Sequence, residues 1–231
     1  MDKKLAYSLF GVVSLMSVGA NAATFDFRHE YRTGDNLDYD RFKVSQVFEN
    51  NMYTALEARW LSYTPASSAM DNLVSNGHEV EVGYIYKPTD KWTFVPYFSI
   101  DSASSANSTA YKYHLKSTYK INDSFYVANR IRLAQVQNQT KSNTNYQQYD
   151  FYAGYKYGPL TLEYDFAYVD TSYSSYKNSH HTYDHNLFVG YTVNSHWTPY
   201  VELGYMPYTP TGGVYGDKWE PRYRVGVTYK M

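Results

Sequence analysis

Apolar and polar residues alternate strictly at the end of the chain, whose last ten residues are RYRVGVTYKM. From Tyr223 onward every second residue is apolar or aromatic, while Arg224 and Lys230 stand among the residues between them. A period of two predicts a β-strand with two unlike faces. Because one face is apolar and the other charged, this strand needs an apolar surrounding on one side and a polar space on the other.

Twelve segments along the chain follow this pattern. Each is about as long as a tilted strand needs to be to cross a bilayer, roughly 9–11 residues. We predict strands at Ala23–Thr33, Asp40–Phe48, Tyr53–Tyr63, His78–Lys87, Trp92–Asp101, Ala110–Ile121, Phe125–Ala134, Tyr149–Tyr157, Leu160–Val169, Tyr183–Val193, Trp197–Tyr205 and Arg222–Met231.

The connections between these segments alternate in length. Short turns follow every second strand, as at Gly158–Pro159, whereas longer polar connections are expected at Thr64–Gly77, Gln135–Gln148, Asp170–Thr182 and Met206–Glu220. Short turns at one end and long loops at the other are typical of outer-membrane barrels, whose short turns are periplasmic. We therefore predict an all-β fold, a twelve-stranded antiparallel transmembrane β-barrel. A secreted β-sandwich is the alternative, but it requires neither this rhythm nor charges at successive inward positions.

The first residues have the layout of a secretory signal peptide. Lys3 and Lys4 precede the apolar stretch Leu5–Val18, and Ala20-Asn21-Ala22 supplies small residues around a cleavage site. We expect residues 1–22 to be removed and residues 23–231 to form the barrel. The exported chain contains no cysteine, so disulfides do not stabilise it.

Composition supports a membrane barrel and gives no sign of a nucleic-acid partner. The formal net charge is −1, whereas a nucleic-acid-binding domain is usually strongly basic. Aromatic residues make up 19% of the chain, and Tyr and Trp favour the membrane–water interface. Trp92 and Trp197 each follow a short turn, which places them at the periplasmic rim.

Charged residues of the predicted strands fall on the inward face. Basic residues come from the first two strands and the last, and again from the sixth and seventh strands, so two basic stripes should face each other across the lumen: Arg28, Arg32, Arg41, Lys43, Arg222, Arg224 and Lys230 in one, and Lys112, Lys116, Lys120, Arg130 and Arg132 in the other. Acidic residues lie on the walls between them: Glu57, Glu79, Glu81, Glu163 and Asp165.

Two opposed basic walls would select anions, because guanidinium groups bind carboxylates bidentately and charged rings set pore selectivity. Lumenal tyrosines would stack on sugar faces. The alternative is that these charges pair across the lumen and close it. A closed barrel would then serve envelope integrity or adhesion through its loops.

Signals for catalysis or metal binding are weak. The stretch HHTYDH offers His180, His181 and His185, but the spacing fits no strong metal-ligand pattern. GDNLDYD resembles part of a calcium loop without its terminal Glu. We predict no metal, no cofactor and no catalytic residue. An outer-membrane lipase or protease remains an alternative, for which His180, His181 and Asp184 are the candidate cluster.

Several stretches resemble the oligogalacturonate-specific (KdgM-type) porins, a family that includes porins for sialic acid: TFDFRHEY, DRFKVSQVFENNMYTALEARW, SNGHEVEVGYIYKPTDKWTFVPYF, NSHWTPYVELGY and RYRVGVTYK. The resemblance covers nearly the whole mature chain. It implies a monomeric twelve-stranded barrel in the outer membrane of a Gram-negative bacterium, which passes acidic oligosaccharides along two facing basic tracks. The positions that match those tracks are Arg28, Arg41, Lys43, Arg130, Arg132, Arg222 and Arg224.

The end of the chain departs from the usual barrel pattern. It closes on Met231, where outer-membrane barrels usually end in Phe, while Tyr229, Val227 and Val225 keep the rest of the terminal signal. The expected partners are the lipid bilayer, acidic oligosaccharides and the barrel-assembly machinery, which would engage the C-terminal strand.

Overall fold

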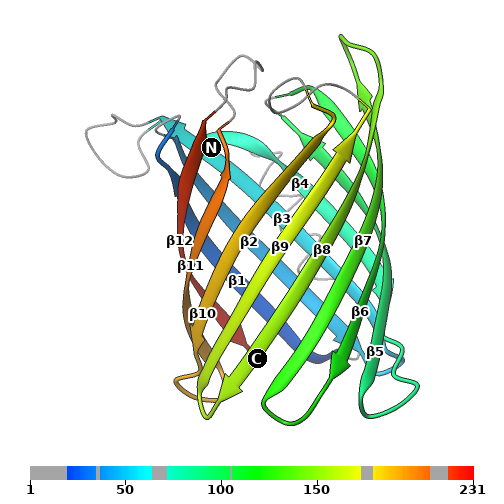
Figure 1. Ribbon diagram of the computed structural model, residues 1–231, viewed down its shortest axis with the longest axis vertical. Coiled ribbons are helices and arrows are strands. Elements are labelled where there is room, and N and C mark those ends of the chain that lie inside the picture. The colour runs from blue at the N-terminus through cyan, green and yellow to red at the C-terminus, as the bar shows by residue number, and fades with distance from the viewer. Residues whose placement is uncertain (1–19, 35–36, 64–71, 105, 173–178, 209–217) are drawn as a thin grey trace.

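Twelve antiparallel strands form a closed barrel in the described part of the chain, as predicted (Figure 1). The computed structural model describes residues 20–34, 37–63, 72–104, 106–172, 179–208 and 218–231. The strands are β1 (Ala20–Arg32), β2 (Leu37–Phe48), β3 (Met52–Tyr63), β4 (Val74–Tyr84), β5 (Trp92–Ala103), β6 (Ser108–Lys120), β7 (Phe125–Asn138), β8 (Thr144–Tyr157), β9 (Leu160–Thr171), β10 (His181–Tyr191), β11 (Trp197–Pro207) and β12 (Trp219–Lys230).

The barrel closes where β1 pairs with β12. The register runs from Thr24 opposite Lys230 to Arg32 opposite Arg222, and the Met231 amide donates a hydrogen bond to the Ala23 carbonyl at 3.0 Å. The predicted mature N-terminus and the C-terminus therefore lie at the same end of the barrel as the short turns. Closure leaves neither β1 nor β12 as an unpaired sheet edge, a requirement for strands in lipid.

The β7–β8 hairpin differs from the sequence prediction. Gln135–Gln148 was expected to be a loop, but β7 continues to Asn138 and β8 begins at Thr144, with Val136 opposite Thr144. This hairpin extends beyond the other strands at the long-loop end (Figure 1). Its residues are largely polar, because strands that leave the lipid lose the two-faced pattern while their backbone pairing continues. The other three long connections lie partly outside the described residues.

Large apolar side chains cover the outer surface. Leu133, Leu187, Leu203 and Val225 expose between 43% and 54% of their area. In a water-soluble monomer so many exposed apolar residues would be unusual, whereas a lipid-facing surface requires them. No helix among the described residues is long and apolar enough to cross a membrane.

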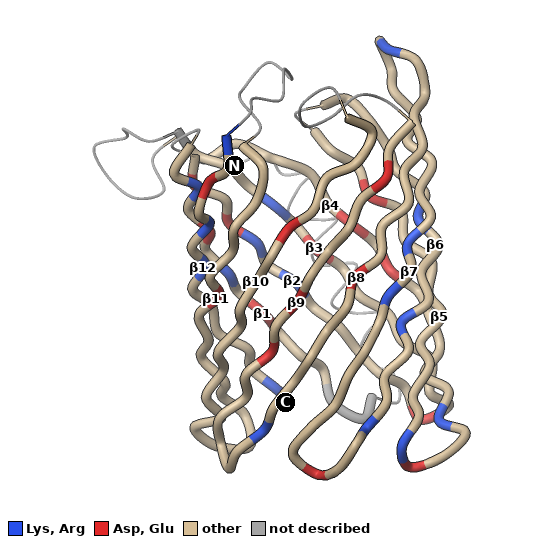
Figure 2. The backbone as a smooth tube through the Cα atoms, in the orientation of Figure 1, with Lys and Arg blue, Asp and Glu red and all other residues tan. Residues whose placement is uncertain are grey.

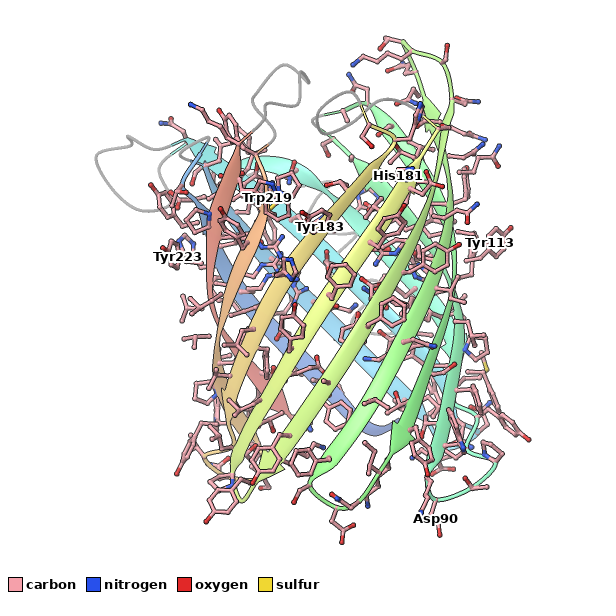
Figure 3. The ribbon with its side chains drawn as sticks, in the orientation of Figure 1. Asp90, Tyr113, His181, Tyr183, Trp219 and Tyr223 are labelled. Carbon is pink, nitrogen blue, oxygen red and sulfur yellow. The ribbon has the colours of Figure 1, made fainter. Side chains whose placement is uncertain are left out.

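Aromatic side chains gather at both rims of the barrel. At the short-turn end, Trp92 packs on Tyr119 and Trp197 packs on Tyr229, with ring centroids 4.8 and 4.7 Å apart. At the other end, Trp219 lies 4.7 Å from the Tyr183 ring (Figure 3). These two girdles match the depths at which aromatic rings favour the membrane interface, and Trp92 and Trp197 lie at the rim that the sequence predicted.

Candidate functional site

Most charged side chains of the strands point into the barrel. They alternate with the exposed apolar residues, and basic and acidic residues both follow the strands along the barrel wall (Figure 2). Every basic and acidic residue that the sequence analysis assigned to the lumen lies on this inward face. The face combines residues that are far apart in sequence, because the register aligns Arg28 with Arg41 and Arg41 with Arg59.

Two basic stripes lie on opposite walls. In the closed ring of strands, the same number of strands separates β1 from β7 in both directions. We call Arg28, Arg32, Arg41, Lys43, Arg222 and Arg224 the seam stripe, because they flank the junction of β1 and β12. We call Lys112, Lys116, Arg130 and Arg132, on β6 and β7, the far stripe.

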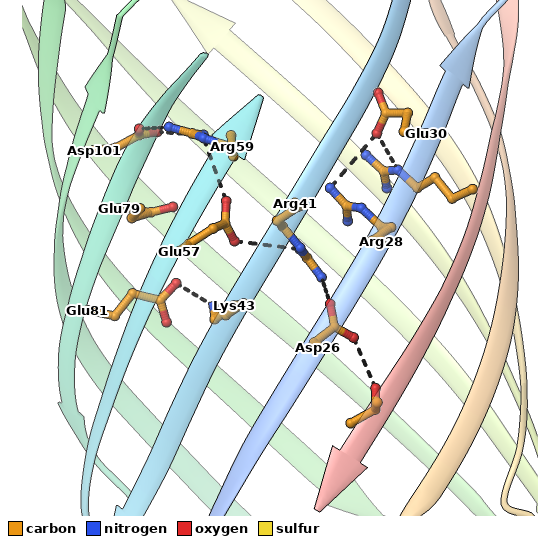
Figure 4. Close-up of polar contacts among 12 residues, drawn as sticks. Asp26, Arg28, Glu30, Arg41, Lys43, Glu57, Arg59, Glu79, Glu81 and Asp101 are labelled. Atoms are coloured by element: carbon orange, nitrogen blue, oxygen red, sulfur yellow. Dashed lines mark hydrogen bonds and ion pairs between the residues drawn. The ribbon is translucent and has the colours of Figure 1, made fainter. Parts of the chain in front are cut away.

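Glu30 holds the upper part of the seam stripe together. Its carboxylate accepts a hydrogen bond from Arg224 Nε at 2.5 Å, and Arg28 Nη2 lies 3.9 Å away (Figure 4). It also accepts from Arg32 Nε at 2.6 Å. Only 1% of Glu30 is exposed. Charge-assisted contacts of this kind are among the stronger hydrogen bonds, so one buried carboxylate gathers three arginines at the seam.

The rest of the seam stripe is also paired with acids. Arg41 binds Asp26 and lies 3.6 Å from Glu57, and Lys43 donates to Glu81 at 2.7 Å (Figure 4). Arg222 and Arg224 both contact Glu202. The positive charge of this stripe is therefore largely compensated within the wall.

The far stripe holds two cations without an acidic partner. Arg130 pairs with buried Asp150 at 2.8 Å, and Lys112 pairs with Asp101 at 2.6 Å. Among the described basic residues of the two stripes, only Arg132 and Lys116 have no carboxylate within 4.0 Å. The two stripes are thus unequal, and the uncompensated charge lies on β6 and β7.

The direct contacts of these two cations are with neutral groups. Arg132 Nη1 donates to Gln148 Oε1 at 2.8 Å, and its Nε donates to His114 Nδ1 at 3.4 Å. The Lys116 ammonium lies 4.6 Å from the centre of the Tyr152 ring, a cation–π contact that leaves the charge in place.

The two acidic walls differ as well. Glu57, Glu79 and Glu81, on β3 and β4, all form ion pairs with basic neighbours. On β9, Glu163 accepts from Tyr126 Oη at 2.6 Å, and Asp165 accepts from Asn186 Nδ2 at 3.4 Å. Within the described chain, neither of these β9 carboxylates forms an ion pair within 4.0 Å.

The ion pairs run around the wall. Each described pair in the lumen joins residues on the same strand or on strands at most two apart, as with Lys43 on β2 and Glu81 on β4. The side chains of Arg28, Arg32, Arg41, Lys43, Arg59 and Arg130 remain 18% to 24% exposed. Since these groups point inward, solvent reaches the lumen. The described ion pairs do not close the barrel by pairing across it, which was the alternative from sequence.

The histidine cluster of HHTYDH does not converge on one point. His180 Nδ1 lies 2.9 Å from the Thr171 carbonyl, and His181 pairs with Asp170 at 3.3 Å. The side chain of Asp184 lies on the inward face of β10, opposite to the face of His181. Among the described residues, no group of three or more His, Cys, Asp or Glu could hold a metal ion.

Several lumenal residues that contact the stripes were not predicted from the sequence. They are the acids Asp101 and Asp150, and the neutral residues Tyr97, Ser99 and Gln148. The period of two would have placed them inward, since each is an even number of positions from a predicted lumenal residue or its cross-strand partner. Their pairing, in contrast, depends on the register between strands.

Comparison with known proteins gives one consistent family. The family model described as "Oligogalacturonate-specific porin protein (KdgM)" matches residues 16–231. The chain is 32% identical to the oligogalacturonate-specific porin KdgM of Dickeya dadantii, over 99% of this chain and 100% of that porin. It is 28% identical to the N-acetylneuraminic acid outer membrane channel protein NanC of Escherichia coli (strain K12), over 92% of each.

Solved structures share the fold. The structure of the KdgM porin has a TM-score of 0.66 at 25% identity and covers 89% of this chain and 98% of its own. The NanC porin has a TM-score of 0.73 at 22% identity and covers 90% of this chain and 100% of its own.

Proposed function

This chain belongs to the oligogalacturonate-specific porin family, so it is a porin of the outer membrane, and we propose that small acidic oligosaccharides diffuse through it. The relatives are named for oligogalacturonate and for N-acetylneuraminic acid. Both solutes carry a carboxylate on a six-membered sugar ring. We propose that this shared group, a ring carboxylate, defines the substrate class.

The observation that carries the proposal is the uncompensated charge of the far stripe. Arg132 and Lys116 face the lumen without an acidic partner, opposite a seam stripe whose charges are paired. A guanidinium group presents a planar fork of donors that matches a carboxylate. A passing uronate therefore finds in Arg132 and Lys116 the two cations of the described stripes that have no carboxylate partner.

The acidic residues of β9 also favour a solute path along β6 and β7. Glu163 and Asp165 on β9 form no close ion pair among the described residues, so they should repel a carboxylate toward β6 and β7. A sugar chain with one carboxylate per ring would move from one cation to the next. Each contact must stay weak, because a pore that binds tightly cannot release its solute. This transport is diffusion, in which no bond is made or broken.

Three further expectations belong to this proposal. Residues 1–22 are removed as a signal peptide, and the register shift of β1 between Ala20 and Ala23 lies beside the proposed cleavage site. The barrel-assembly machinery engages β12, whose last residue is Lys230. The mature porin is a monomer.

Liposome swelling tests the proposed function. Wild-type protein in vesicles should pass an acidic trisaccharide, such as trigalacturonate, faster than a neutral trisaccharide of equal size. The double substitution of Arg130 and Arg132 by Ala should lower the acidic flux several-fold and leave the neutral flux nearly unchanged. Lumenal substitutions tune selectivity more than they unfold a barrel. An equal change for both sugars would mean that these arginines only shape the bore.

The two single substitutions should differ. Arg130→Ala leaves buried Asp150 without its cation and adds a free negative charge, whereas Arg132→Ala removes a positive charge that no acid compensates. We expect both to reduce acidic flux, but only Arg130→Ala to reduce the stability of the barrel.

A further inference from the structure

Arg132 is held by a closed circuit of side chains on β5 to β8. Two contacts to the guanidinium group are direct, from Gln148 Oε1 at 2.8 Å and His114 Nδ1 at 3.4 Å. Both partners are neutral. Guanidinium has five N–H donors, and no nitrogen of Arg132 is buried without a partner. The donors that the circuit does not use therefore face solvent in the lumen.

The Gln148 side chain is oriented by its own neighbour. Its Nε2 donates to Asp150 Oδ1 at 2.7 Å, so its Oε1 is directed to Arg132. The charge of Asp150 is taken by Arg130, whose Nε donates to Oδ2 at 2.8 Å. The Gln148 amide thus lies between Asp150 and Arg132 and forms a hydrogen bond with each. Because the amide is neutral, it does not compensate the charge of Arg132.

The His114 ring is fixed from two sides. Its Nε2 lies 3.1 Å from the hydroxyl of Ser99, a residue with no exposed area. The Tyr97 ring stacks on it with a centroid distance of 4.0 Å and an interplanar angle of 5°. Because Arg132 donates to Nδ1, that nitrogen must accept, which leaves Nε2–H to donate to Ser99. His114 is 6% exposed and holds Arg132 in one place.

Arg130 closes the circuit. Its Nη1 donates to the Tyr97 hydroxyl at 3.4 Å, and Tyr97 is the residue that stacks on His114. Each member of the circuit is thereby oriented by another, which reduces the rotamer freedom that Arg132 would lose on binding a solute.

We propose that Gln148 and His114 are positioning residues for Arg132, which hold its free donors toward a passing carboxylate while leaving its charge uncompensated. This inference rests on the proposed function. It assigns to Gln148 and His114 a part in the discrimination between acidic and neutral sugars, although neither residue carries a charge in this arrangement.

The seam stripe offers a matched control at Arg222. Asn186 is also an amide that accepts from an arginine, since Arg222 Nη2 donates to its Oδ1. Arg222, however, also has the carboxylate of Glu202 at 3.8 Å. Removing this amide should matter less for a solute, because Arg222 is already partly compensated.

The test compares Gln148→Leu with Asn186→Leu by liposome swelling and by reversal potential under a salt gradient. Gln148→Leu keeps every lumenal charge, so its reversal potential should equal that of the wild type. Its flux of trigalacturonate should fall several-fold, and its flux of a neutral trisaccharide should not change. Asn186→Leu also removes the 3.4 Å hydrogen bond to Asp165 but keeps the charge of that carboxylate, so it should leave all three quantities near the wild-type values.

A second pair of variants tests the same inference through His114. His114→Leu should lower the acidic flux as Gln148→Leu does. His114→Asn can place an amide oxygen near the position of Nδ1, and it should restore the flux. Folding of each variant is checked by the shift in gel mobility between unheated and boiled samples.

The inference is overturned if Gln148→Leu and His114→Leu, both folded, pass trigalacturonate as fast as the wild type. It is also overturned if Asn186→Leu loses as much acidic flux as Gln148→Leu. A wild-type porin that does not prefer the acidic sugar would instead contradict the proposed function itself.

Discussion

Arg224 of β12 donates a hydrogen bond from Nε to Glu30 of β1 at 2.5 Å, across the seam at which the barrel closes. The same carboxylate accepts from Arg32 at 2.6 Å and is 1% exposed. The first and last strands are thus joined by an ion pair as well as by their backbone ladder. The seam stripe therefore stabilises the junction of β1 and β12, which explains why most of its charges are compensated.

Glu30→Gln should destabilise the barrel by about 3–5 kcal/mol, the usual cost of removing one partner of a buried ion pair. The substitution leaves Arg32 and Arg224 side by side without their shared carboxylate. Urea unfolding in lipid vesicles, followed by tryptophan fluorescence, measures the change. Glu163→Gln is the control, because Glu163 has no ion pair among the described residues, and it should cost less. Equal losses of unfolding free energy in both variants would contradict the stabilising role of Glu30 at the seam.

Gly226→Ala should destabilise the barrel by about 1–3 kcal/mol through overpacking. The Tyr200 ring crosses Gly226 to donate from its hydroxyl to Asp26 at 3.2 Å, and a Cβ at Gly226 would lie 2.3 Å from Tyr200 Cζ. A Cβ would also lie 2.7 Å from the Phe27 carbonyl oxygen.

The double variant Gly226→Ala with Tyr200→Ala distinguishes the clash with the Tyr200 ring from the clash with the Phe27 carbonyl oxygen. Residues in contact are not additive, so the double variant should be more stable than the sum of the single losses predicts. Thermal unfolding in detergent provides the comparison. Full additivity would mean that Tyr200 does not depend on Gly226.

The folded barrel should resist detergent at room temperature without disulfides. All twelve strands are paired around the ring, and the chain has no cysteine. Unboiled and boiled samples should therefore migrate differently on a denaturing gel, both with and without reductant. Identical migration would argue against a closed barrel in the isolated protein.

The strands could be predicted because lipid outside and water inside impose a period of two on every membrane-crossing segment. The prediction was wrong at Gln135–Gln148, where β7 and β8 continue beyond the lipid. There both faces of the hairpin meet water, so apolar and polar residues do not alternate. Within the membrane-crossing part of β7, the period of two also predicts that Arg130 and Arg132, two residues apart, both point inward.

The difference between these two arginines could not be predicted. Register places Asp150 opposite Arg130 and Gln148 opposite Arg132, so one arginine is neutralised and the other is not. Pairs such as Lys43 with Glu81 also span the intervening strand β3. Such contacts depend on the alignment of three strands and on side-chain rotamers, which the alternation of residues does not determine.

The reversal potential of a single channel in a planar bilayer, under a gradient of potassium chloride, tests the central claim most directly. The uncompensated Arg132 and Lys116 predict a preference for chloride over potassium. The preference should weaken as the salt concentration rises, because the Debye length is about 8 Å near physiological ionic strength and shortens with added salt. A clear preference for potassium would contradict this account, since it would mean that Glu163 and Asp165, rather than the far stripe, set the selectivity of the pore.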